Sequence, residues 1–430
     1  MPAKATSVRG NALAGALNRS ALRHLTRDGA LLFLTRFTRL FSHGALSVVL
    51  VFYLTGLGLS ESQTGVLLTL TLLGDTLVSL LLTTQADRIG RRRMLMVGAL
   101  LMAGAGLIFA STSSFFFLVL AGTIGVISPS GHEVGPFLPI EQAALTQVIP
   151  AVERTAVFAW YALIGSIATA AGSLFAGLLT QRIQRVAVTA VASERAIILI
   201  YAALGLVLLG LFARLSSAAE VRRNAGVSLE VKNFLGIGSS RSIVIKLSSL
   251  FALDSFGGGF VVQSFAAYWF YLRFGVAPAT LGGIFFGANL FAGSSALIAS
   301  RLAARFGLVK TMVYTHLPSN VLLILIPLMP NLSLAILVLL LRFSISQMDV
   351  PTRQSYTMAV VSPEERSAAA GITGVARTTG AALAPVFAGL LFARPALIDV
   401  PFFIAGTLKI AYDLLLYRAF VRLPPPEESR

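Results

Sequence analysis

Long apolar segments alternate with short polar stretches along most of the chain. An α-helix needs about 20 apolar residues to cross a bilayer, so this pattern predicts membrane-spanning helices. We expect an all-α membrane protein with twelve transmembrane helices. The expected segments are residues 31–56, 62–84, 94–111, 114–130, 155–180, 195–214, 247–271, 279–300, 311–329, 332–348, 366–393 and 400–420.

One interior polar stretch is longer than the others and divides the twelve segments into six and six. It reads as a linker between two helical bundles. The expected parts are a basic N-terminal tail (1–30), an N-terminal six-helix bundle (31–214), the linker (215–246), a C-terminal six-helix bundle (247–420) and a C-terminal tail (421–430).

The two halves repeat each other in sequence. Pro139–Leu179 aligns without gaps with Pro351–Leu391, and both segments end in Phe-Ala-Gly-Leu-Leu. A second alignment pairs Gly90 with Gly307. An ungapped match of this kind predicts two pseudo-symmetric bundles.

A short basic turn lies between the second and third segments. It contains Asp87, Arg88, Gly90, Arg91, Arg92 and Arg93. The spacing resembles the Gly-x-x-x-Asp-Arg-x-Gly-Arg-Arg signature of the major facilitator superfamily, except that Thr83 replaces the leading glycine. The resemblance implies that this turn acts as a cytoplasmic gate and that two bundles open a central cavity to each side in turn. It further implies that the second, fifth, eighth and eleventh helices form the contact between the halves.

Basic residues are unevenly divided between the two sides of the membrane. Loops and tails on the side of the termini carry 24 lysines and arginines, and the opposite loops carry 5. Cytoplasmic loops are enriched in these residues, so both termini are expected in the cytoplasm. We expect the plasma (inner) membrane, and favour a basic tail over an organelle-targeting segment for residues 1–30.

The composition agrees with a multi-pass membrane protein. Of 430 residues, 56% are hydrophobic and 12% charged, and the mean hydropathy is +0.82. The net charge of +16 resides mostly in short loops, so a nucleic-acid partner is not expected. The chain has no cysteine, which excludes disulfides and thiolate chemistry.

Several ionisable residues fall inside the apolar segments, where a charge is costly unless it faces water or a partner. The candidates for substrate or ion coupling are Arg39, His43, Asp75, Glu133, Asp254, Arg342 and Arg377. Acids that exchange protons beside arginines suit proton-coupled transport. For Asp75 and Arg377, a fixed interhelical ion pair is an equally weighted alternative.

Two further sets of charges have expected partners. Lys409 and Asp413 are one turn apart on the last segment and are expected to pair with each other. Glu141 aligns with Arg353 in the repeat, and a salt bridge that closes the cytoplasmic side is one interpretation, with solvated loop charges as an equally weighted alternative. The cytoplasmic gate candidates are Glu141, Arg353, Glu153, Arg154, Glu365 and Arg366.

These features predict a secondary active transporter that moves a small solute by alternating access. Proton coupling and an anionic or zwitterionic organic substrate are expected, with a multidrug efflux antiporter and a non-transporting sensor as alternatives. No catalytic constellation, Walker loop, metal site or cofactor motif stands out, so no enzyme is expected. The expected partners are the bilayer, the substrate and protons, and we expect a monomer.

Overall fold

The computed structural model describes residues 25–131, 135–150, 153–186, 189–220, 238–362 and 365–423. The helices of the first half are α3 (Arg27–Gly56), α4 (Glu61–Ile89), α5 (Arg91–Ser111), α6 (Phe115–Ile124), α7 (Phe137–Val148), α8 (Arg154–Gln184) and α9 (Ala190–Phe212). Those of the second half are α10 (Arg241–Gly259), α11 (Gln263–Phe274), α12 (Pro278–Phe306), α13 (Leu308–Leu325), α14 (Leu332–Ser346), α15 (Asp349–Ala359), α16 (Arg366–Phe392) and α17 (Val400–Phe420). Short 3₁₀ turns occur at Ser217–Ala219, Ile326–Leu328 and Pro395–Leu397.

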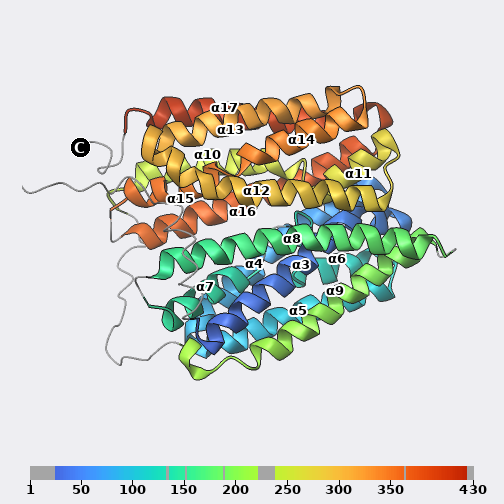
Figure 1. Cartoon of the computed structure of the whole chain (residues 1–430), viewed down its shortest axis with the longest axis horizontal. Helices are drawn as coiled ribbons and strands as arrows, with labels where there is room; N and C mark the ends of the chain where they lie inside the picture. The colour runs from blue at the N-terminus through green and yellow to red at the C-terminus, as the bar shows by residue number, and fades with distance from the viewer. Residues whose placement is uncertain are drawn as a thin grey trace, which may run out of the picture.

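The helices form two bundles that lie side by side, with the first half in blue to green and the second in yellow to red (Figure 1). Eleven spans among the described residues are long and apolar enough to cross a membrane, and the short apolar helix α6 provides the twelfth segment. The predicted all-α, twelve-helix architecture is confirmed.

Three predicted helices are interrupted. The fourth segment leaves its helix at Ile124, earlier than expected, and resumes as α7. The seventh breaks between Gly259 and Gln263, and the tenth breaks between Ser346 and Asp349. Interrupted membrane helices at protein-lined depth are typical of transport sites, because their freed backbone groups can bind ligands.

The basic turn of the sequence is almost entirely helical. Helix α4 continues to Ile89 and α5 starts at Arg91, so only Gly90 separates them. Gly90 has φ +120°, which favours glycine, and a Cβ there would lie 3.3 Å from a carboxylate oxygen of Glu220. The turn expected between the second and third segments is therefore present but is shorter than the stretch 86–93, because one glycine suffices to reverse the chain.

The two halves contact each other through α4 against α16 and α8 against α12, as the family resemblance implied. Glycines permit the closest approach near the ends that face away from the termini. A Cβ at Gly177 would lie 2.4 Å from the Pro278 carbonyl oxygen, and one at Gly65 would lie 2.5 Å from that of Pro385. Close backbone contact of this kind replaces side-chain packing between membrane helices.

Candidate functional site

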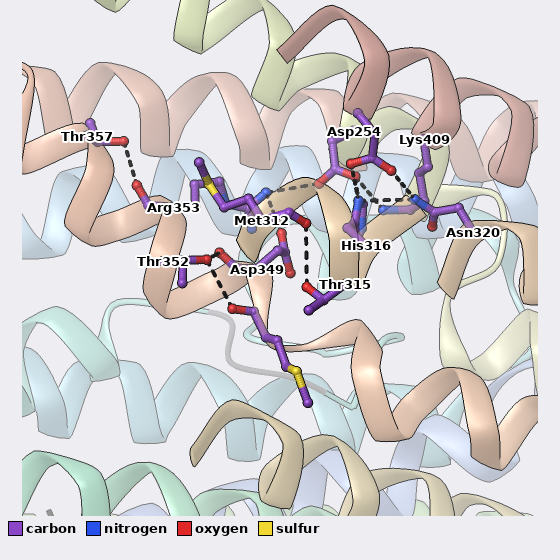
Figure 2. Close-up of polar contacts among 12 residues, drawn as sticks. Asp254, Met312, Thr315, His316, Asn320, Asp349, Thr352, Arg353, Thr357 and Lys409 are labelled. Atoms are coloured by element: carbon purple, nitrogen blue, oxygen red, sulfur yellow. Dashed lines mark hydrogen bonds and ion pairs between the residues drawn. The ribbon is translucent and has the colours of Figure 1, made fainter. Parts of the chain in front are cut away.

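A cluster of buried charges fills the interior of the second half. Asp254 on α10 lies between two cations that come from different helices (Figure 2). Its Oδ1 is 2.6 Å from Lys409 Nζ on α17, and its Oδ2 is 3.0 Å from an Arg353 guanidinium nitrogen on α15. All three side chains are buried. The cluster therefore ties three helices of this half together through one carboxylate.

Asp413 has a different partner from the one expected. Its Oδ1 is 2.8 Å from His316 Nδ1 on α13, and Asn320 Nδ2 donates to its other oxygen at 2.9 Å. The predicted pairing of Lys409 with Asp413 is wrong in this structure, because Lys409 contacts Asp254 on a neighbouring helix. Placement one turn apart puts two residues on one face of a helix but does not decide which helix each side chain reaches.

Asp349 completes the cluster from the start of α15. Its Oδ2 lies 3.4 Å from the same Arg353 nitrogen that contacts Asp254. One ligand atom each from Asp254, His316 and Asp349 lies within 4.8 Å of the others, a spacing that a cation can bridge. The ammonium of Lys409 and the guanidinium of Arg353 already contact these acids, so the arrangement is suited to ion pairing rather than to metal ligation.

The first half contains a corresponding pair with the charges exchanged. Arg39 on α3 contacts Glu141 on α7 at 2.6 Å, and both side chains are fully buried. Thr35 donates to the other Glu141 oxygen at 2.8 Å, and the Tyr161 hydroxyl also donates to this carboxylate. Each half thus joins its first helix to the helix that follows the break in its fourth segment.

These pairs correct the expected salt bridge between Glu141 and Arg353. Each residue has its ion-pair partner within its own half, Arg39 for Glu141 and Asp254 for Arg353. The repeat alignment identified equivalent positions correctly, but equivalence across the pseudo-twofold places the two residues in separate bundles.

Arg342 and Arg377 differ from the other arginines at membrane depth. In the described part of the chain, neither guanidinium makes a hydrogen bond or an ion pair, although both interact electrostatically with Asp254 and Asp349. The alternative of a fixed pair between Asp75 and Arg377 is therefore not what the structure contains. Two cationic groups next to the cluster are available to a bound anion.

The remaining candidates for substrate or ion coupling lie in the first half. Asp75 on α4 accepts a hydrogen bond from the Gly135 N–H at 3.0 Å, which stabilises the break before α7. His43 is fully buried on α3, with its ring 6.3 Å from the ring of Tyr201. Glu133 lies outside the described residues.

The gating motif contacts its own half. Arg91 Nε is 2.9 Å from Asp87 Oδ1, while the Asp87 side chain is 66% exposed. Glu220 accepts hydrogen bonds from the Arg91 and Arg92 N–H groups at 2.7 and 3.1 Å and so caps the start of α5. Arg92 also donates to the Leu215 carbonyl. Arg88 and Arg93 are exposed.

The Glu-Arg pairs of the repeat are equivalent in structure as well as in sequence. Arg154 donates to the Thr146 carbonyl at 3.1 Å, and Arg366 donates to the Met358 carbonyl at 2.9 Å. Both bonds span eight residues, and Thr146 aligns with Met358 in the repeat. These arginines, at the starts of α8 and α16, thus hydrogen-bond to the last turns of α7 and α15.

The two acids of the Glu-Arg pairs are less alike. Glu153 is the residue before α8. Glu365 accepts hydrogen bonds from the backbone around Ser240, where α10 begins. Hydrogen bonds from Ser240 and the Gly238 N–H lower the pKa of Glu365 to about 2. The carboxylate therefore remains charged and holds the end of the linker to the second half.

Hydrogen bonds between described residues of the two halves lie at the helix breaks and on the side away from the termini. Ser264 at the start of α11 donates through its N–H and its hydroxyl to the Pro129 carbonyl, at 3.1 and 2.6 Å. Gln263 donates to Ser47 and Ser173 at 2.8 and 3.1 Å. Two broken helices, one from each half, thus meet directly.

Further hydrogen bonds between the two halves lie nearer the helix ends that face away from the termini. Tyr268 donates to Glu61 at 2.9 Å, and the Ala279 N–H donates to Gln181 at 3.0 Å. Closer to the middle, the Val386 N–H donates to Thr69 at 2.9 Å. The side that faces away from the termini is therefore closed in this structure.

Sequence reasoning missed several members of these networks. They are Thr35, Tyr161, Gln263, Ser264, His316, Asn320 and Asp349. His316 and Asn320 are one turn apart within an apolar segment, and Asp349 and Arg353 are one turn apart directly after the tenth segment. Such i, i+4 pairs of polar residues at membrane depth are a signal that the sequence did contain.

Comparison with known proteins agrees with this architecture. Residues 32–346 match the sequence profile of the Major Facilitator Superfamily. The chain is 31% identical over 425 residues to the uncharacterised membrane protein YJR124C of Saccharomyces cerevisiae, covering 92% of this chain and 94% of that protein.

Solved transporter structures share the fold at low sequence identity. A bacterial homologue of the human lysosomal transporter Spinster is 16% identical, covers 93% of this chain and 95% of its own, and has a TM-score of 0.67. The nucleoside transporter NupG is 14% identical over 92% and 99%, with a TM-score of 0.72. The human organic anion transporter MFSD10 is 15% identical over 92% and 99%, with a TM-score of 0.57. This integral, multi-pass membrane protein belongs to the Major Facilitator Superfamily of transporters.

Proposed function

We propose that the chain is a secondary active transporter that moves a small organic solute by alternating access, coupled to protons. The supporting observation is the one-sided closure between the halves, through Gln263, Ser264, Tyr268 and Ala279. Two rigid bundles with separable contacts at one end can exchange that closure for one at the other end. The relative named above as a Spinster homologue was solved in an inward-facing conformation, and we assign the same class of state here. We further propose that both termini lie in the cytoplasm, which the distribution of lysine and arginine supports, and that the protein resides in the plasma membrane.

An anionic or zwitterionic substrate is supported by the unpaired guanidinium groups. In the described residues, Arg342 and Arg377 have no hydrogen-bond or ion-pair partner. Both side chains are partly buried and their Nε atoms have no hydrogen-bond partner, and a carboxylate or phosphate of a substrate would bind such a guanidinium in a bidentate manner. One of the structural neighbours is named as an organic anion transporter, which fits the same substrate class.

Multidrug export receives less support from the structure than from the sequence. The seventh segment carries several aromatic residues that would suit an amphiphilic compound, namely Phe256, Phe260, Phe265, Tyr268 and Trp269. Of these, Phe265 and Trp269 are fully buried. Trp269 donates to Asp399 at 2.7 Å, and Phe265 stacks on Phe392. These rings hold helices together and are not available to line a binding site.

The experiment is a thermal-stability screen of the purified protein against small anions, amino acids, nucleosides, sugars and drug-like cations. A ligand that binds the folded state raises the unfolding temperature. We expect stabilisation by an organic anion, lost in Arg342→Gln and in Arg377→Gln but retained in Arg301→Gln, an exposed arginine on α12.

Uptake of that anion into proteoliposomes, dependent on a pH gradient, would separate a transporter from a sensor. Stabilisation by hydrophobic cations alone, unaffected by the arginine substitutions, would replace this proposal with multidrug export. Binding without flux under any gradient would support a sensor.

A further inference from the structure

The buried cluster of the second half has an unequal number of fixed charges. Asp254 and Asp349 contact the permanent cations Lys409 and Arg353, whereas Asp413 contacts neither of them. Among the described residues, a positive charge in contact with Asp413 comes only from the imidazole of this cluster when it binds a proton. The state of one proton therefore decides whether Asp413 has a cationic partner.

His316 is the group at which that proton is shared. Its Nδ1 is 2.8 Å from Asp413, and its Nε2 is 3.7 Å from Asp254 (Figure 2). Among the described residues, His316 is the one basic side chain in contact with Asp413, since Asn320 is neutral. Without the proton, Asp413 would be a buried charge with no cationic partner, which is strongly unfavourable.

Other charged or titratable groups face the imidazole from each neighbouring helix. The Tyr412 ring on α17 packs edge-on at 5.8 Å, and Asp349 and Arg353 lie on α15. Arg342 on α14 and Arg377 on α16 act on the same acids from farther away. The first half has no equivalent, because the alignment that pairs Gly90 with Gly307 places Ala99 opposite His316.

The cluster is connected to the closed side through the broken seventh segment. Asp254 lies in the last turns of α10, which ends at Gly259, and α11 begins at Gln263. Gln263 and Ser264 make the hydrogen bonds that join α11 to the first half. A shift of α10 that follows a change of charge around Asp254 would therefore act directly on these bonds.

We propose that the His316–Asp413 pair is a proton-binding site, and that the proton held there stabilises the state in which α11 is closed against the first half. The proposal rests on the transport function proposed above and assigns its coupling proton to residues on α13 and α17. When the proton leaves, Asp413 is a buried negative charge without a cationic partner. This charge weakens the contacts of the cluster with Asp254 on α10 and favours opening of the side away from the termini.

The test needs only protons as the ligand. The natural chain has no cysteine, so spin labels can be placed at Ser113 and Ala396, two exposed positions on the side away from the termini, one in each half. The distribution of distances between the two spin labels is measured by pulsed electron paramagnetic resonance for the full-length protein in nanodiscs, from pH 5.5 to 8.5. We expect short distances at acid pH and a gain of longer distances at alkaline pH. The population ratio should change about tenfold or more, since one linked proton changes such a ratio by up to tenfold per pH unit.

The double variant His316→Gln/Asp413→Asn keeps hydrogen-bonding groups but removes both titrating ones, and should give a distribution that does not change with pH. Tyr314→Phe, a substitution at an exposed position on α13, should respond as the natural protein does. If the double variant does not fold, Asp413→Asn alone is used, with the same expectation.

Either of two results would overturn the proposal: no pH response in the natural protein, or an unchanged response in the variant. Transport of the solute, measured separately, would survive such a result, so the two proposals fail independently.

Discussion

At the scale of single residues, the two halves use the same position for opposite charges. Arg39 pairs with Glu141 in the first half, and Asp254 pairs with Arg353 in the second. The first pair is completed by hydroxyl donors, whereas the second is surrounded by further ionisable groups. A carboxylate such as Asp254, which contacts several charged or titratable groups, can respond to protons.

The pairing of Asp254 makes a prediction about stability. Asp254→Asn should lower the free energy of unfolding by about 3–5 kcal/mol, because it leaves buried cations without their carboxylate. Adding Lys409→Met should recover part of that loss, since the uncompensated ammonium is then removed. The measurement is a double-mutant cycle from thermal unfolding in detergent. Strictly additive effects would show that the two residues are not coupled, and the distance of 2.6 Å between their atoms would then carry no energetic weight.

At the scale of elements, the breaks in the fourth and seventh segments have local sequence causes and are completed by tertiary contacts. Proline and glycine between Ile124 and Phe137 make the first break recognisable in the sequence. The second follows three glycines, and the last of them packs closely, since a Cβ at Gly259 would lie 2.4 Å from the Ala381 carbonyl oxygen. The broken ends then satisfy each other, because the Pro129 carbonyl accepts from Ser264.

Helix contact across the halves gives a second prediction. Gly177→Ala should disfavour the closed state, because the added methyl group would lie 2.4 Å from the Pro278 carbonyl oxygen on α12. The matched control is Gly210→Ala, where a Cβ meets nothing within 4 Å, and which should change stability by only about 0.5–1 kcal/mol, in the stabilising direction. Spin labels at Ser113 and Ala396 report the outcome. If both variants show the natural distance distribution, contact at Gly177 does not limit closure.

At the scale of the whole molecule, two bundles meet along α4 with α16 and α8 with α12, and the linker ends are held to separate bundles. Glu220 holds one end to α5, and Glu365 holds the other to the start of α10. Each bundle therefore carries its own anchor, and the halves can move against each other without loss of either. This arrangement matches the rigid-body motion that we propose for transport.

The gating motif supplies the prediction at this scale. Among the described residues, Asp87 pairs with Arg91 of its own half, so we propose that it acts as a latch in the alternative state, in which the side of the termini is closed. Asp87→Asn should therefore increase the population of the present state. Spin labels at the exposed Gln147 on α7 and Ser355 on α15 should show a gain of longer distances. Gln85→Ala, an exposed change on the same helix, serves as the control. An identical distribution in Asp87→Asn and in the natural protein would contradict a latch at this position.

Sequence by itself determined the twelve helices and the two related halves. The family resemblance added which helices join the halves, as α4 and α16 illustrate. Hydrophobic length and an internal repeat are properties of the chain that need no knowledge of neighbours. The partners of the buried charges were decided only by tertiary structure. Lys409 and Asp413 share one face of α17, yet one reaches Asp254 and the other His316. A helical repeat fixes the direction of a side chain, but the energy of a buried charge depends on which other helix supplies its counter-charge.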